Sequence, residues 1–323
     1  MSDATGRLAR WAPSVRALRG AGILVGVLLA CALLGLVVGG AAVGIAALLG
    51  AASVITLTLR GPSRGDFAWF VIVLASGSAA SAALATEPIV GLVVTLTVLA
   101  LAPLVLRHGA VAGIVPVIVS TLGTGDIPVS PWSAVAGIGI GAVVAALVLR
   151  RLGLPRLDAA LPAPRVIRGY LVLLASLTGL AMAFGIAAEL PHAVWIVIAI
   201  STVLVPMSHD TFARARPRIT GTVLGAVLGS AVATALPPAV SVALAVAALL
   251  FGIAHAISGH RVEFVALMAL AVVTLIGAAA PVDALEAGAT RIGLTVLGTG
   301  VAIAAGLALV RLEVGSSRSA SRN

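Results

Sequence analysis

The sequence predicts an all-α, polytopic membrane protein, and its hydropathy, its scarce charges and the spacing of its apolar runs all support that class. Of the 323 residues, 61% are hydrophobic and only 10% are charged, and the mean hydropathy is +1.21. A soluble protein needs about a quarter of its residues charged to cover its surface. Apolar runs of about 20 residues recur along the chain, which is the length of helix that crosses roughly 30 Å of hydrocarbon.

Charged residues divide the chain into about twelve such runs. The first follows four arginines and is longer than the roughly 7–15 apolar residues of a cleavable signal, so we expect it to be retained as a span. Several runs are separated only by Gly, Pro or one acid, so a count of ten is also compatible with the pattern. The expected spans are 21–39, 41–59, 67–86, 88–106, 109–125, 132–149, 169–188, 191–207, 219–236, 238–257, 262–280 and 290–310.

The basic residues indicate how the spans are oriented. All 20 are arginines, and an arrangement with the N-terminus in the cytoplasm puts every one except Arg291 on the cytoplasmic side. Cytoplasmic loops retain Arg and Lys, so both termini are expected in the cytoplasm. The arginines stand in short clusters between apolar runs, which favours contact with anionic lipid head groups over binding to nucleic acid.

The chain also resembles itself at an offset of about 150 residues. Residues 15–36 align with 164–185, and 52–60 align with 200–208. This similarity predicts two parallel six-helix repeats, as some secondary transporters have, although chance similarity between Ala/Val/Leu-rich segments would look the same. The expected parts are an N-terminal cytoplasmic tail 1–20, a first membrane half 21–149, a cytoplasmic linker 150–168, a second membrane half 169–310 and a C-terminal cytoplasmic tail 311–323.

A ladder of small residues marks the ninth span. Gly221, Gly225 and Gly229 recur every four residues, which leaves one side of the helix nearly flat for a neighbouring helix or for a second copy in a homo-oligomer. Ordinary close packing and a moving contact both suit this pattern. Pro217 suits the first turn of a helix, so we expect the span to begin near residues 216–218.

This region resembles the fusaric acid resistance-like (FUSC) membrane proteins, which include the aromatic acid exporters. The resemblance covers about residues 168–310 and is weak before them. It implies an exporter of the bacterial inner membrane for aromatic or other organic acids, driven by the proton gradient. Many larger relatives carry a cytoplasmic domain between two membrane modules, where this chain has only the 150–168 linker. The matching residues, in order, are Trp195, Pro206, Thr211, Arg214, Arg218, Gly221, Thr222, Gly225 and Gly229.

An exporter of organic anions needs cationic groups along its route, because a carboxylate loses much hydration energy in a low dielectric unless it is paired. The candidates for substrate binding are Arg214, Arg218, Thr222 and Arg291. Arg218 leads them because the expected helix start would add free N–H groups beside it. Anchoring to phosphate is the alternative for the cytoplasmic arginines. An ion pair with Asp283 or Glu286 is the alternative for Arg291, which the sequence places on the outer side.

Proton coupling needs a group that changes protonation, and no acid stands at the centre of an expected span. Glu263 is the first candidate, with an ion pair to Arg261 as the structural alternative. Asp210 and His209 are the next candidates, and helix capping or contact with solvent is the structural alternative for both.

Catalysis is not expected. The sequence has no His-Glu-x-x-His, Gly-x-Ser-x-Gly or phosphate-loop motif, and its single cysteine, Cys31, stands in an apolar run. We therefore expect no catalytic residue, no metal and no cofactor, and we expect small organic anions and protons as the ligands. A membrane scaffold, and less readily an enzyme acting on lipid-linked substrates, are the competing functions.

Overall fold

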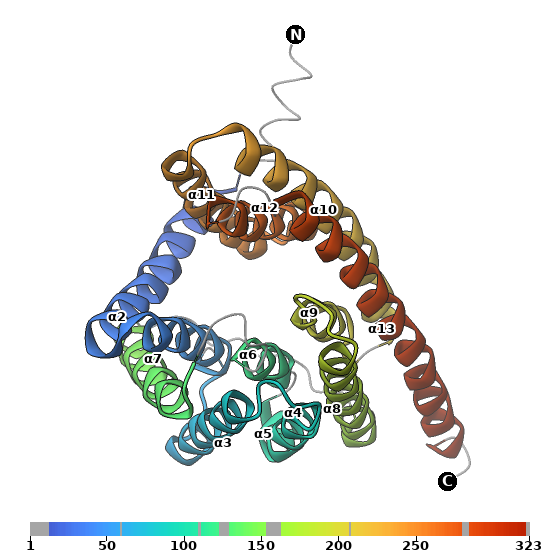
Figure 1. Cartoon of the computed structure of the whole chain (residues 1–323). Helices are drawn as coiled ribbons and strands as arrows, with labels where there is room; N and C mark the ends of the chain where they lie inside the picture. The colour runs from blue at the N-terminus through green and yellow to red at the C-terminus, as the bar shows by residue number, and fades with distance from the viewer. Residues whose placement is uncertain are drawn as a thin grey trace. The chain divides into compact units, whose positions relative to one another are not determined.

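The structure is a computed structural model that describes residues 13–58, 60–108, 111–122, 129–152, 163–206, 208–279 and 284–320, and every regular element in these ranges is helical (Figure 1). The expected all-α class is therefore confirmed. The helices are α2 (Val15–Thr58), α3 (Arg64–Ala83), α4 (Val90–Ala100), α5 (Ala102–His108), the 3₁₀ helix η1 (Val111–Ile114), α6 (Val115–Leu122), α7 (Pro131–Arg151), α8 (Pro164–Ala187), α9 (Val194–Val203), α10 (Ser208–Ala235), α11 (Pro238–Ile257), α12 (Arg261–Ala279) and α13 (Ala284–Ala320).

By length and composition, eight helices of the described residues can cross a membrane, or nine if α4 and α5, which meet at 44°, form one bent span. The chain is thus a polytopic membrane protein. Helix α2 counts once among the eight, yet it is broken at Gly39 and Gly40, and Gly40 has a φ of +77° that glycine adopts without strain. A Cβ on Gly35 would lie 2.7 Å from the carbonyl oxygen of Val43, so the chain folds back here. This break separates the first two expected spans where the sequence places it.

Twelve full spans are not confirmed, because two of the expected runs contain only short helices in their described residues. The run 191–207 becomes α9, which has 10 residues and so rises about 15 Å, half the hydrocarbon thickness. Its end is fixed by Leu204, which is extended, and by Pro206. The run 109–125 becomes η1 and the eight-residue α6. The two six-helix repeats are not confirmed either.

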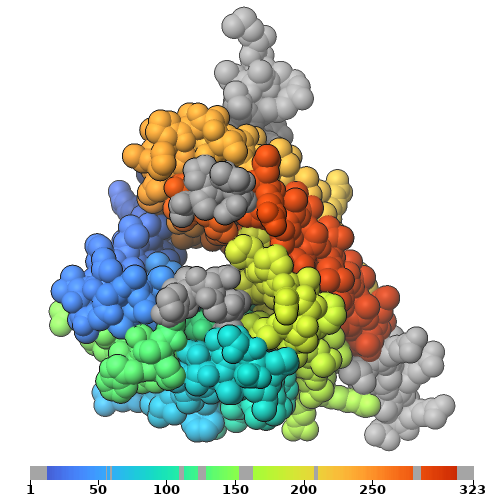
Figure 2. All heavy atoms as spheres, viewed as in Figure 1, coloured from blue at the N-terminus to red at the C-terminus, as the bar shows by residue number. Residues whose placement is uncertain are grey.

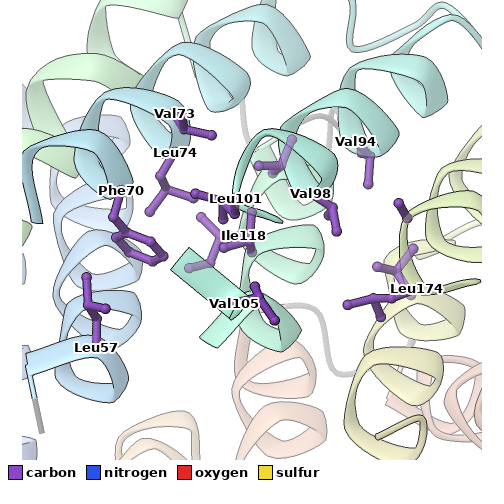
Figure 3. Packing of buried hydrophobic residues seen from close by; sticks show 14 of the residues in the cluster. Leu57, Phe70, Val73, Leu74, Val94, Val98, Leu101, Val105, Ile118 and Leu174 are labelled. Carbon is purple, nitrogen blue, oxygen red and sulfur yellow. The ribbon is translucent and has the colours of Figure 1, made fainter. Parts of the chain in front are cut away.

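The described chain forms two compact units, one of residues 1–26 with 216–293 and the other of residues 27–215 with 294–323. The larger unit holds the main apolar core, where side chains from α2, α3, α4, α5, α6 and α8 meet (Figure 3). Phe70, Leu74 and Ile118 are almost fully buried there. The space-filling view shows that side chains fill the spaces between the ribbons of α3, α4 and α7 (Figure 2).

Small residues let the helices of this larger unit approach closely. A Cβ on Gly137 would lie 2.6 Å from the carbonyl oxygen of Val43, and one on Gly50 would lie 2.8 Å from the Cα of Ile138. Helices α4 and α8 meet in the same way, and the Thr95 hydroxyl donates to the carbonyl of Ala175 at 3.1 Å. Backbone contact of this kind is the usual source of packing energy in lipid.

Charges in the larger unit satisfy each other. Asp66 caps the start of α3 together with Ser63, accepts from Arg107 at 2.8 Å and lies 3.2 Å from His108 Nε2. Arg60 in turn donates to the carbonyl of His108. The cluster joins the beginning of α3 to the end of α5, and it leaves this carboxylate fully engaged.

The smaller unit contains α11, α12, the part of α10 from residue 216 and the start of α13, and α11, α12 and α10 lie side by side in Figure 1. Its apolar centre is a contact between α11 and α12 at Ala245, Ala248 and Ala271. These small side chains leave little room between the two helices. The candidate residues Arg218, Thr222, Glu263 and Arg291 all belong to this unit.

Candidate functional site

Helix α10 places Arg218 far from either of its ends. The helix begins at Ser208, so the expected start near residues 216–218 is wrong and Pro217 lies inside the helix. Arg218 stands ten residues, or roughly 15 Å, beyond the first residue. The free N–H groups of a helix start are therefore not beside it. Pro217 removes one backbone hydrogen bond from the helix. Membrane helices tolerate this loss where neighbouring groups satisfy the freed carbonyl.

One face of α10 carries the glycine ladder, and its partner is α12. A Cβ on Gly221 would lie 2.7 Å from Val265 Cβ, and one on Gly229 would lie 2.9 Å from the carbonyl oxygen of Leu270. A Cβ on Gly225 would overlap the carbonyl oxygen of Ala266. The Thr274 hydroxyl also donates to the Gly229 carbonyl at 3.3 Å. The ladder thus serves close helix packing.

A second face of α10 carries Arg218, Thr222, Ala226 and Ser230, which recur every four residues. This face is directed at α13, because a Cβ on Gly288 would lie 2.5 Å from Ser230 Oγ and 3.6 Å from the Ala226 carbonyl oxygen. Arg291 stands three residues beyond Gly288 and therefore shares its side of α13. The two helices bring polar side chains to one place in the smaller unit.

Arg218 and Arg291 are both buried, with 8% and 6% of their surfaces exposed, and they lie close enough for their positive charges to repel each other. The sequence places them at opposite ends of their spans, but the structure brings them together. Among the described residues Arg218 makes no hydrogen bond or ion pair, and its Nε is fully enclosed. Glu286 forms no ion pair with Arg291, and Asp283 lies outside the described residues.

Thr222 adds a buried hydroxyl to the same place. Its residue surface is only 1% exposed, and its Oγ1 has no hydrogen-bond partner among the described residues. Thr220 and Thr234 on the same helix behave differently, because each donates to the carbonyl four residues earlier. The Thr222 hydroxyl remains available for a ligand or a water molecule.

This arrangement can bind an anion. A buried charge without a partner, such as that of Arg218, is strongly unfavourable, and a like charge close enough to repel it adds to that cost. A carboxylate bound at Arg218 would pair with its guanidinium, would reduce the repulsion between Arg218 and Arg291, and could accept from the Thr222 hydroxyl, since arginine binds carboxylates through paired N–H donors. We call Arg218, Thr222 and Arg291 the cationic cluster.

The other arginine candidate, Arg214, lies in the larger unit, where it interacts electrostatically with the buried Tyr170 of α8. Asp210 stands in the first turn of α10, where a negative charge favours the helix. His209 belongs to the backbone of α10, but its side chain lies outside the part that the structure describes.

Glu263 is partly exposed near the start of α12 and forms no ion pair with Arg261. It attracts His255 instead, and His255 lies against His260 with 3.2 Å between their Nδ1 atoms. The sequence analysis did not select this histidine pair. The sequence does contain a signal for it. His255 and His260 are five positions apart with Ser258 and Gly259 between them, a pattern typical of a helix that ends at glycine and turns tightly into the next helix.

The larger unit contains a cavity of about 310 Å³ at the end of α8, lined mostly by apolar side chains. Glu189 and His192 border it with φ values of +50° and +57°, which are uncommon for residues other than glycine. His192 stacks on Trp195, with ring centroids 5.2 Å apart. None of the residues selected from the sequence lines this cavity.

Residues 174–305 match the model of a family described as "Fusaric acid resistance protein-like". This range agrees with the resemblance over 168–310, and it runs from α8 into α13. Comparisons with curated proteins and with solved structures found no match. The chain therefore contains a fusaric acid resistance protein-like domain, which spans residues 174–305 and includes Arg218, Thr222 and Arg291.

Proposed function

We propose that the protein is a secondary transporter of the bacterial inner membrane that exports organic acids, with aromatic acids as the first class to test, and that it performs transport and no catalysis. The cationic cluster is the observation that carries this proposal. The family match and the membrane-spanning helices also support this proposal.

The chemistry of the cluster favours a carboxylate. An organic anion that leaves water needs its lost hydration replaced, and two guanidinium groups can supply several charge-assisted hydrogen bonds at once. The apolar surroundings strengthen these bonds because water does not compete. The exporter would use the cluster as the binding point for the acid group, while the helices around it accommodate the apolar remainder.

The other ligands follow from the same proposal. Protons moving down their gradient would supply the driving force. The exposed arginines in the first turns of the helices, such as Arg64, Arg168 and Arg261, would contact anionic lipid head groups on the cytoplasmic side, where both termini would also lie.

The test is a flux assay with the purified chain in liposomes, using benzoate, 4-hydroxybenzoate and a non-aromatic acid, with protein-free liposomes to measure passive leak. We expect flux of at least one acid above leak. Arg218→Gln and Arg291→Gln should each reduce it by about tenfold or more, because hydrogen bonds to a charged group are each worth about 1.5–3 kcal/mol.

Arg216→Gln is the matched control, because Arg216 is exposed and stands on the same helix two residues before Arg218. Equal flux in Arg218→Gln and Arg216→Gln would remove the cationic cluster from the route. No flux of any acid by the parent, together with one constant partner in membrane pull-downs, would replace transport with a scaffold role.

A further inference from the structure

The turn between α11 and α12 holds two histidine rings together. Helix α11 ends at Ile257 with Ser258 as its C-cap, and the next residue, Gly259, has a φ of +82°. The His260 N–H donates to the His255 carbonyl at 2.9 Å, and the Gly259 N–H donates to the Ala256 carbonyl at 3.2 Å. These two bonds are the glycine-ended helix cap, which reverses the chain within one turn. His255 and His260 are therefore neighbours because of the backbone.

The two rings are placed to share a proton. Their Nδ1 atoms lie 3.2 Å apart and their centroids 5.4 Å apart, and His255 is 8% exposed. When both rings are neutral, one Nδ1–H donates to the lone pair of the other. One added proton makes one ring an imidazolium, which donates to the remaining neutral ring in a stronger, charge-assisted bond. A second proton would set two N–H groups against each other and break the bond.

Helix α12 supplies a negative charge that acts on this histidine pair. Glu263 attracts a positive charge on His255, and Arg261 is exposed to solvent. His255 also stands in the last turn of α11, where the helix dipole favours a cation. Glu263 and the helix dipole thus favour a cation at His255, against the desolvation cost of its burial.

A segment of α2 also packs against this end of α11, since a Cβ on Gly20 would lie 3.4 Å from Ile257 Cδ1. The charged residues on that segment are Arg16 and Arg19, and both are exposed. Water screens their charges, and among the described residues outside the pair Glu263 is the one whose charge acts on His255.

We propose that His255 and His260 together bind the single proton that is exchanged in each transport cycle. This inference rests on the proposed function and adds to it the site of the coupling ion. The first turns of α12 connect this pair to the cationic cluster, because Val262 and Val265 contact α10 at Gly221. A change in the pair that shifts α12 therefore acts on α10 beside Thr222.

The first measurement is independent of transport. In the purified full chain with ¹⁵N-labelled histidine, NMR should show a ¹⁵N–¹⁵N coupling across the Nδ1–H···Nδ1 bond between His255 and His260. The coupling should disappear at low pH when the second proton binds, and it should be absent in His260→Asn. An absent coupling in the parent at all pH values would overturn the proposal.

The second measurement uses liposomes and 4-hydroxybenzoate. Asparagine keeps a hydrogen-bonding atom at the δ position but does not titrate, so His255→Asn and His260→Asn preserve the contact without the proton. Both variants should lose accumulation driven by a pH gradient by about tenfold, and both should keep exchange at equal pH within about twofold.

His192→Asn is the matched control, because asparagine readily adopts the positive φ that His192 has. Gradient-driven accumulation at the parent level in either pair variant would overturn the coupling role. A parent that moves no acid would refute the proposed function, whereas the NMR coupling would still decide whether the pair holds a proton.

Discussion

The two inward faces of α10 differ in whether their polar atoms have hydrogen-bond partners. On the ladder face, Gly221, Gly225 and Gly229 meet the α12 backbone so closely that no Cβ fits. On the face directed at α13, Arg218 and Thr222 are just as buried, yet their polar atoms have no partner among the described residues. The first face accounts for the packing of the unit. The second costs free energy in the empty state and therefore indicates a ligand.

The larger unit contains a cluster in which a buried charge is paired with opposite charges and hydrogen-bond donors. There Asp66 accepts from Arg107, lies within bonding distance of His108, and completes the cap with Ser63. A stable cluster of this kind pairs opposite charges and satisfies their hydrogen bonds. Arg218 has no such partner among the described residues and is repelled by the like charge of Arg291, so stability does not explain Arg218.

The largest effect is expected on the ladder face. Gly225→Val would force a side chain into the carbonyl of Ala266 and separate α10 from α12. Overpacking of this kind typically costs about 1–3 kcal/mol, and a clash with backbone belongs at the upper end. Thermal unfolding in detergent would measure it. Gly293→Val is the control, because nothing lies within 4 Å of a Cβ at Gly293; equal losses in both variants would mean that the ladder is not a close contact.

The next effect has the opposite sign. Arg218→Met should raise the free energy of unfolding by about 2 kcal/mol, because an apolar side chain of similar length removes a buried, unpaired charge. The same variant should lose transport. Arg216→Met, at an exposed position, should leave stability nearly unchanged. A destabilised Arg218→Met would show that Arg218 has a structural partner, and the contrast between the two faces would fail.

The sequence predicted those features that depend on local pattern. Hydropathy indicated the class, and the boundary that we expected between the spans 21–39 and 41–59 coincides with the break at Gly39 and Gly40. The four-residue period of the ladder indicated a flat face for a neighbouring helix. The start of α10 was predicted wrongly from Pro217, because proline only prefers the first helical position and can also lie inside a helix. The helix already includes Thr211, six residues before Pro217, and the Thr211 hydroxyl oxygen accepts a hydrogen bond from the Val205 N–H at 3.3 Å.

The features that depend on tertiary packing were out of reach. The sequence named Arg218, Thr222 and Arg291, but it placed the two arginines on opposite sides of the membrane. Their meeting requires that α13 return along the same face of α10, which no local pattern encodes. The histidine pair was missed for another reason: its spacing matters only when Gly259 adopts a positive φ and ends α11 there.

The smallest expected effect distinguishes two buried threonines of the same unit. Thr222 and Thr274 are 1% and 0% exposed, but only Thr274 donates a hydrogen bond, to the Gly229 carbonyl. Thr274→Val should therefore lower the free energy of unfolding by about 0.6 kcal/mol, the usual value of an interhelical bond in a membrane.

Thr222→Val should instead leave stability equal or slightly higher, since valine keeps the shape and removes a hydroxyl that was buried without a partner. Binding of 4-hydroxybenzoate, followed as the rise in unfolding temperature with ligand concentration, should weaken by about tenfold or more in Thr222→Val, because a hydrogen bond to a charged group contributes about 1.5–3 kcal/mol. It should not change in Thr274→Val. If both variants lost the same stability and kept the same affinity, the Thr222 hydroxyl would serve packing, and the carboxylate would have to be held by the guanidinium groups alone.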